Sequence, residues 1–255
     1  MHILLTNDDG VYAPGLLAMR KELQKLGEVT VVAPATEQSA TGHSITLLTP
    51  LIVNEVYDDR DEPMGWAVEG KPADCVKLAL VELLREPPDL VVSGLNAGSN
   101  AGINVIYSGT VAAAIEGAFF DLVSMAVSLE YGSPVHLNFP RAAELALRVI
   151  QQILDRKPAK GSLFNINIPS LDKGEPKGVR VVPQGLTRYR ERYDRRTDPR
   201  GRVYFWITPD IRQPPRVENT DVAALTEQYI TVTPLKFDLT EPTMLNQMRS
   251  WDWQL

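Results

Sequence analysis

The sequence contains one cysteine, Cys75, and nowhere a run of about 18 apolar residues, the length that a membrane-spanning helix needs. A disulfide within the chain is therefore excluded, and a reducing compartment is expected. The first residues lack a basic segment followed by an apolar core, so no signal peptide is expected. These absences together predict a cytoplasmic protein without a membrane partner.

An excess of positive charge is also lacking: 26 Lys and Arg stand against 32 Asp and Glu, which gives a net charge of −6. The isoelectric point is about 5.2. No basic field recruits nucleic acid, so a stable nucleic-acid complex is not expected. An anionic substrate would need a local cation. The 255 residues, 44% of them hydrophobic, suffice for one large domain or for one domain with an appendage.

Short apolar or β-branched segments alternate with helical segments over roughly the first two thirds of the chain. Helices are expected from Pro14 to Leu26, from Pro72 onward, after Ser108, and from Arg141 to Arg156. Strands are expected at residues 1–6, 28–34, 45–53, 66–68, 89–96, 121–129 and 163–169. This alternation predicts an α/β fold with a doubly wound, mostly parallel sheet.

The pattern changes after residue 178, which divides the chain into an α/β domain (1–178) and a segment of strands, turns and one helix (179–255). We expect a projecting β-hairpin from about Arg188 to Ile207, turning at residues 198–201, then a helix and a final strand. The hairpin mixes Arg with aromatic and acidic residues, which favours subunit contact over nucleic-acid binding. Trp251 and Trp253 would be costly to expose, so the tail should dock on the body or on a partner chain.

Asp8 and Asp9 lie between the first expected strand and the first expected helix. Ligands of open α/β sheets bind outside the carboxyl ends of the strands. Two adjacent carboxylates repel each other unless a cation separates them or one is protonated. Carboxylate oxygens suit Mg²⁺, Mn²⁺ or Ca²⁺. The alternative is a simple turn, since Asp and Gly are common turn residues.

Two loops rich in small polar residues follow other expected strands. In the first, residues 35–44, the side chains of Ser39, Thr41 and His43 could face Asp8 and Asp9, although loop capping explains each equally well. The second runs from Asn96 to Ser108 and ends at a helix start where free backbone N–H groups favour a phosphate. It is neither a Walker A loop nor a dinucleotide fingerprint.

Together these motifs resemble the SurE family, the stationary-phase survival proteins that act as 5′-nucleotidases. The resemblance rests on the order of segments that are individually unspecific: residues 6–10, 38–42, 72–76, 93–100, 107–113 with 116–117, 198–201, and 220–221 with 230–235. It implies a Rossmann-like body, an extended hairpin, and a homodimer or homotetramer with exchanged C-terminal elements. It also implies a metal-dependent phosphomonoesterase that hydrolyses nucleoside 5′-monophosphates.

Carried onto this sequence, the resemblance implies one divalent ion, Mg²⁺ or Mn²⁺, with these ligands: Asp8, Asp9, Ser39 and Asn96. Catalysis would involve Asp8, Asp9 and Asn100. We expect the substrate to contact Asn7, Gly42, Ser108, Gly109 and Thr110. The attacking group is either an activated water molecule or Asp8 itself. Lys71 and Gln228 depart from the family pattern, and Lys71 could alter the pocket rim.

Two other functions stay open. A nucleoside N-ribohydrolase also uses an Asp cluster after its first strand, but it has a further Asp where this chain has Thr6 and Asn7. A non-catalytic nucleotide-binding module is the second alternative, although it gives no reason for two carboxylates. Release of free base would favour the hydrolase, and nucleotide binding without turnover would favour the module.

Overall fold

The computed structural model describes residues 1–132, 137–186, 192–208 and 217–254. Within them, nine strands form one sheet in the order β3-β4-β2-β1-β5-β6-β7-β11-β8. The strands of this sheet are β1 (His2–Thr6), β2 (Glu28–Pro34), β3 (Val53–Tyr57), β4 (Pro63–Val68), β5 (Leu90–Ala97), β6 (Val123–Leu129), β7 (Leu163–Ile168), β8 (Val179–Val181) and β11 (Ile230–Leu235). The six central strands from β4 to β7 are parallel, while β3 and β11 run antiparallel to their neighbours β4 and β7.

The chain reverses its direction of winding between β1 and β5. From β1 it proceeds outward to β2 and β4, and it then returns to place β5 against the other side of β1. The sheet is therefore doubly wound, as the sequence predicts, and the β1/β5 boundary is its switch point. In such sheets the crevice at the carboxyl ends of these two strands is where ligands bind.

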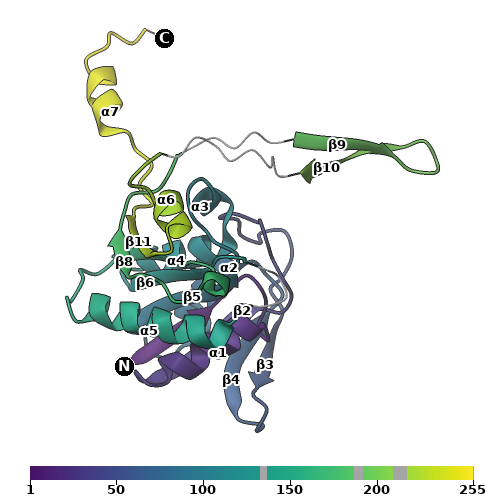
Figure 1. Ribbon diagram of the computed structural model, residues 1–255, viewed down its shortest axis with the longest axis vertical. Helices are drawn as coiled ribbons and strands as arrows, with labels where there is room; N and C mark the ends of the chain where they lie inside the picture. The colour runs from purple at the N-terminus through teal and green to yellow at the C-terminus, as the bar shows by residue number, and fades with distance from the viewer. Residues whose placement is uncertain (133–136, 187–191, 209–216, 255) are drawn as a thin grey trace.

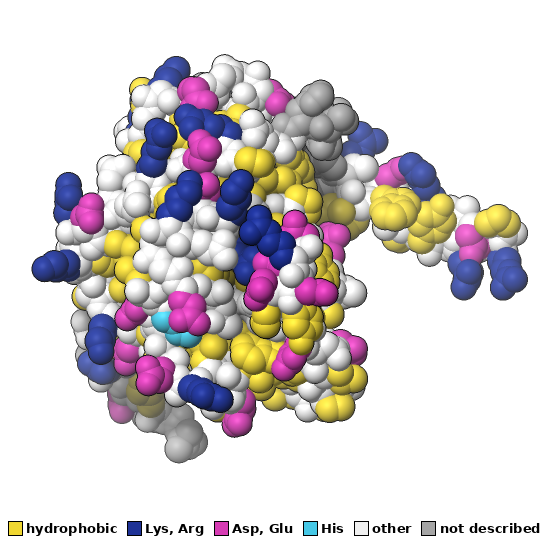
Figure 2. Space-filling view, turned by 90° about the horizontal axis from the view of Figure 1, so that it is seen from below, with side chains coloured by type: hydrophobic (Ala, Val, Ile, Leu, Met, Phe, Trp, Pro, Cys, Tyr) yellow, Lys and Arg dark blue, Asp and Glu magenta, His cyan; other side chains and the backbone are white. Residues whose placement is uncertain are grey.

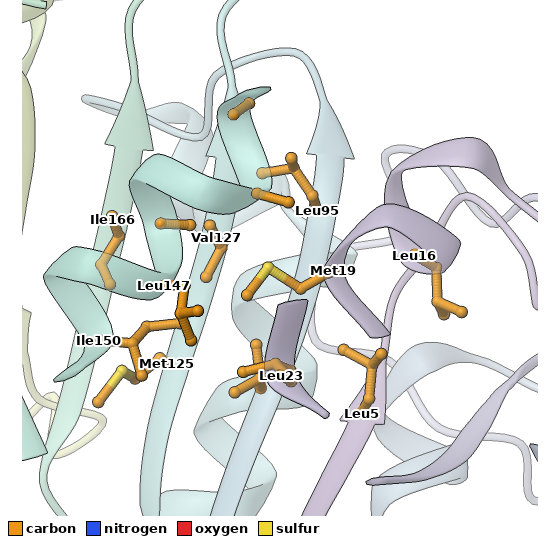
Figure 3. Packing of buried hydrophobic residues seen from close by; sticks show 14 of the residues in the cluster. Leu5, Leu16, Met19, Leu23, Leu95, Met125, Val127, Leu147, Ile150 and Ile166 are labelled. Carbon is orange, nitrogen blue, oxygen red and sulfur yellow. The ribbon is translucent and has the colours of Figure 1, made fainter. Parts of the chain in front are cut away.

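Helices cover both faces of the sheet (Figure 1). One face carries α1 (Pro14–Leu23) and α5 (Phe139–Leu154), and the other carries α2 (Pro72–Leu78) and α4 (Gly109–Phe119). Met19 and Leu23 of α1 meet Leu147 and Ile150 of α5 above the sheet residue Met125, all within one buried cluster (Figure 3). Both layers bury the parallel strands, which explains their nearly continuous apolar sequences.

The strand predicted at residues 45–53 is wrong. The structure has no regular element from 45 to 52, and β3 begins only at Val53. Thr46 explains the difference, because its backbone N–H and its hydroxyl both donate to the Asp74 carboxylate at the start of α2. Leu47 and Leu48, which a buried strand would enclose, are 80% and 99% exposed.

The final strand, β11, and the helix that precedes it attach to the main body. Strand β11 pairs with β7, and β8 pairs with β11. Helix α6 (Asp221–Thr226) starts with Asp221, which is fully buried. The Asp221 carboxylate accepts N–H groups from Gly102 (2.8 Å) and Gly185 (2.8 Å). This side chain therefore joins the segment after residue 178 to the loop before α4.

Two segments with exposed hydrophobic side chains extend away from the body. Strands β9 (Arg192–Thr197) and β10 (Val203–Thr208) form a separate antiparallel hairpin that projects from the body, and α7 (Pro242–Met248) extends from another side (Figure 1). The predicted strand residues 188–191 lie outside the described residues. Hydrophobic side chains gather on the projecting hairpin, beside both acidic and basic ones (Figure 2). Trp206 is 59% exposed, and in the tail Trp253 is 64% exposed.

In the described part of the chain, no helix is both long enough and apolar enough to cross a bilayer.

Candidate active site

The turn after β1 places the two adjacent carboxylates at the switch point. Asn7 is fully buried and fastens this turn: its Nδ2 donates to the Gly10 carbonyl (2.9 Å), and its Oδ1 accepts the Gly10 N–H (3.3 Å). Gly10 has φ +107°, a conformation that other residues rarely adopt. Asn7 thus fixes the direction in which Asp8 and Asp9 leave the strand, and its predicted contact with substrate stays a prediction.

Asp8 is buried and held by the first turn of α4. The Thr110 hydroxyl donates to Asp8 Oδ1 at 2.6 Å. Gly109 lies so close that a Cβ there would fall 2.9 Å from the Asp8 Cβ. A side chain at position 109 would therefore push Asp8 away from the helix start.

Asp9 reaches across the switch point to β5, where its Oδ2 accepts the Ala97 N–H at 3.1 Å. Burial, and next the charge of Asp8, raise the pKa of Asp9 to about 6. Burial also raises the pKa of Asp8, although its bonds to Thr110 act in the opposite direction. In the absence of a cation, the two carboxylates oppose each other's ionisation.

The other two predicted ligands come from the carboxyl end of β5 and from the loop after β2. Asn96 is buried, and its Nδ2 donates to the Gly98 carbonyl at 2.6 Å. That bond leaves Oδ1 without a hydrogen bond to any residue of the described chain. The loop after β2 is tied to Asp8, whose backbone carbonyl accepts the Gln38 N–H at 2.7 Å. Ser39 is exposed, and its hydroxyl donates to Glu37 Oε1 at 2.6 Å.

Asn100 belongs to a buried polar network beneath the site. Its Nδ2 donates to Ser128 Oγ (2.8 Å) and lies 3.3 Å from Thr110 Oγ1, the hydroxyl that bonds Asp8. Its backbone N–H donates to Asn167 Oδ1, and its carbonyl accepts Asn165 Nδ2. Asn100 is therefore fixed at both its backbone and its side chain.

Helix α4 begins at the site with Ser108 as its N-cap. The Ser108 hydroxyl accepts the Val111 N–H at 3.1 Å and leaves the backbone N–H of Gly109 without a hydrogen bond to the described residues. Gly42 of the neighbouring loop donates its N–H to the Tyr107 carbonyl at 3.0 Å. The loop that carries Ser39 is therefore fastened next to the start of α4.

The two neighbouring candidates of that loop have structural partners. His43 Nε2 lies 2.8 Å from Glu116 Oε1 of α4, and Thr41 donates to the Gln38 carbonyl. The Thr41 bond agrees with the capping interpretation, whereas the His43 contact joins the loop to α4.

The donor set fits a hard divalent cation. It offers two carboxylates, one free amide oxygen and one hydroxyl, and all are oxygen ligands of the kind that Mg²⁺ and Mn²⁺ prefer. No Lys, Arg or His in the described ranges forms an ion pair with Asp8 or Asp9. The described residues contain no cluster of three or more His, Cys, Asp and Glu side chains, so neutral oxygens must complete the set.

Sequence reasoning missed several residues around the site. Asn165 and Asn167 are fully buried on β7, where they alternate with Phe164, Ile166 and Ile168. A period of two places both amides on one face, and this signal could have identified them as supports of the site. Glu37 was also missed, although its charge acts on both Asp8 and Asp9.

The fold and site define a doubly wound α/β protein with carboxylate, amide and hydroxyl oxygens gathered at its switch point, beside a helix N-terminus. The family model "Survival protein SurE" matches residues 3–191. The chain belongs to the SurE family, as its motifs predict.

Individual relatives agree over nearly the whole chain. A 5′-nucleotidase SurE from Rhodopirellula baltica is 54% identical, and the match covers 99% of each chain. A 5′-nucleotidase SurE from Syntrophobacter fumaroxidans is 46% identical over 99% of this chain and 100% of its own. The crystal structure of the SurE protein from Aquifex aeolicus superposes with a TM-score of 0.84, at 36% identity and over 98% of both chains.

Proposed function

We propose that this protein is a metal-dependent phosphomonoesterase that hydrolyses nucleoside 5′-monophosphates to nucleoside and phosphate. The enzyme class, 5′-nucleotidase, is confirmed by the names of relatives 42–54% identical over the length of the chain. The nucleoside monophosphate substrate and the metal are our proposal. The observation that carries it is the pair Asp8 and Asp9, two partly desolvated carboxylates without a cationic partner among the described residues, beside the start of α4.

One divalent ion, Mg²⁺ or Mn²⁺, would be held by Asp8, Asp9, Asn96 and Ser39. When bound, such an ion withdraws electron density from the phosphate and neutralises charge that develops in the transition state. Thr110 keeps one Asp8 oxygen oriented through its hydroxyl. The Ala97 N–H does the same for one oxygen of Asp9.

The phosphoryl group would lie against the first turn of α4. The Gly109 N–H and the helix dipole favour its negative charge, and the Ser108 cap keeps the turn in place. Asn100 would orient the substrate or the attacking water, with Asn165 and Asn167 holding its backbone. Water attacks phosphorus, the ester P–O bond breaks, and the leaving oxygen of the nucleoside receives a proton. We assign the removal of the water proton to Asp9, whose Oδ1 has no partner in the described chain.

We further propose that residues 1–178 form the catalytic unit and that 179–255 serve a homodimer or homotetramer with exchanged C-terminal elements. The support is exposed apolar surface: Phe205 and Ile207 on the hairpin are 58% and 60% exposed, and Trp251 in the tail is 52% exposed. Apolar surface of this extent usually marks an interface between chains.

The deciding experiment measures phosphate release from a panel of nucleoside 5′-monophosphates with Mg²⁺ or Mn²⁺, and again with a chelator. We expect metal-dependent release that Asp8→Asn abolishes. Release of free base would instead indicate a nucleoside N-ribohydrolase. Nucleotide binding with metal but without any product would indicate a binding module.

A further inference from the structure

Tyr131 lies at the rim of the site, two residues beyond the end of β6. Its ring covers Gly98: a Cβ at position 98 would fall 2.9 Å from Tyr131 Cε2 and 3.4 Å from Cδ2. The carbonyl of Gly98 in turn accepts the amide hydrogen of Asn96. Gly98 therefore lies between the Tyr131 ring and Asn96, a proposed metal ligand.

The chain on both sides of Tyr131 is anchored to the loop after β7. The Glu130 N–H donates to the Ile168 carbonyl (2.8 Å), and Glu130 Oε2 accepts the Ser170 N–H (3.2 Å). Gly132 packs so tightly that a Cβ there would lie 2.1 Å from Ser170 Oγ. The ring is therefore held over Gly98 before any ligand arrives.

One part of the Tyr131 ring stays open to solvent, because the side chain packs on Gly98 and yet the residue is 53% exposed. Partial burial, and then the charges of Asp9 and Glu37, raise the pKa of the phenol. An aromatic surface thus stands within electrostatic range of the acidic centre. A phosphate oxygen at that centre leaves the rest of an ester substrate to project toward the rim.

We propose that Tyr131 is the aromatic platform on which the nucleobase of the substrate stacks. The inference rests on the proposed function, since it supplies the nucleoside end of a nucleotide whose phosphate binds at α4. Every base has a π-face, so a stacking platform binds bases with little regard to identity, and removal of the ring typically weakens binding about tenfold or more. The platform would therefore select nucleotides over other phosphomonoesters, with modest discrimination among bases.

The test compares a purine nucleoside 5′-monophosphate with ribose 5-phosphate, which has the same phosphoester and sugar but no base. For Tyr131→Ala we expect KM for the nucleotide to rise about tenfold, with kcat changed much less. The preference for the nucleotide, expressed as the ratio of the two kcat/KM values, should fall by the same factor. Tyr131→Phe retains the ring and should retain the preference.

Tyr57→Ala is the matched control, since this tyrosine is also exposed (42%) but lies on β3, at the edge of the sheet. It should leave the preference unchanged. If Tyr131→Ala also keeps the wild-type preference, the platform is refuted while the nucleotidase stands. If the wild-type enzyme releases no phosphate from nucleotides at all, the proposed function itself has failed.

Discussion

Thr110 donates its hydroxyl hydrogen to Asp8 over 2.6 Å, and the same hydroxyl lies 3.3 Å from the amide of Asn100. The side chain of Thr110 is fully buried. It therefore acts on the carboxylate of Asp8 from behind, and any contact between position 110 and a phosphate must come from its backbone. A residue in the first turn of α4 thus controls the orientation of a carboxylate on the loop after β1.

Thr110→Val removes this hydroxyl with little change in volume. Because hydrogen bonds that orient a metal ligand typically contribute about 10- to 100-fold to affinity or turnover, we expect kcat/KM and metal affinity to fall by that factor. Steady-state kinetics and metal titration by calorimetry measure the two effects. Thr226→Val is the control, since the hydroxyl of the exposed Thr226 donates to the Val222 carbonyl within α6. Wild-type metal affinity in Thr110→Val would show that Asp8 needs no such support.

Asp9→Asn should abolish turnover and weaken metal binding while the fold stays intact. The substitution keeps the shape and leaves an oxygen that can accept the Ala97 N–H, but it removes the negative charge. Phosphate release and metal titration measure the effect, and circular dichroism confirms folding. Near-normal activity of this variant would exclude Asp9 from the site.

The stability of the metal-free protein should depend on pH through Asp9. Its pKa is about 6 in the folded protein, above the ordinary value of 3.8, so the protonated form favours folding. This contribution is fully present below pH 3.8 and is lost as the pH rises through about 6.

With chelator present, Asp9→Asn should therefore gain stability relative to wild type as the pH rises from 4 to 7.5, by about 1 to 2 kcal/mol after allowance for partial solvent screening. Denaturant titrations across this range measure the difference. Saturating Mg²⁺ should reverse the order at pH 7.5, because only wild type retains both carboxylates for the ion. A difference that is independent of pH would contradict the assignment of the raised pKa to Asp9.

Deleting the chain from Met244 should disturb assembly more than metal affinity. The removed part of the tail contains Trp251 and Trp253, whose rings contact each other at 5.4 Å between centroids and remain exposed. Light scattering should show a smaller oligomer, whereas metal titration should give the wild-type affinity. An unchanged mass would remove the tail from the interface.

The alternation of apolar strands and helices predicted the doubly wound sheet correctly, because both faces of the parallel strands are buried and their sequences show it. The strand predicted at residues 45–53 was wrong for a tertiary reason. Thr46 bonds the Asp74 carboxylate, which is remote in the sequence, and no local pattern reports such a partner.

At the site, the sequence indicated which loops would converge, since polar residues follow successive strand ends. The sequence did not reveal which of these residues support the site and which of them face it. Asn7 proved to be the fastener of the turn, and Thr110 proved to be the partner of Asp8. The role of Asn7 is local, within one turn, whereas the role of Thr110 depends on a contact between segments 102 residues apart. Tyr131 follows a strand end as well, but a single exposed aromatic carries no local signal of its neighbours.

The buried carboxylate of Asp221 binds N–H groups on two separate loops, at Gly102 and at Gly185. The protein therefore cannot be separated near residue 178 into two independent fragments. A fragment of residues 1–178 would lose the hydrogen bond from Gly102 to Asp221, which holds the loop after Asn100. It would also lose β11, so the edge of β7 would be exposed to other chains. For protein engineering, the assembly segment and the catalytic centre must therefore be kept in one chain.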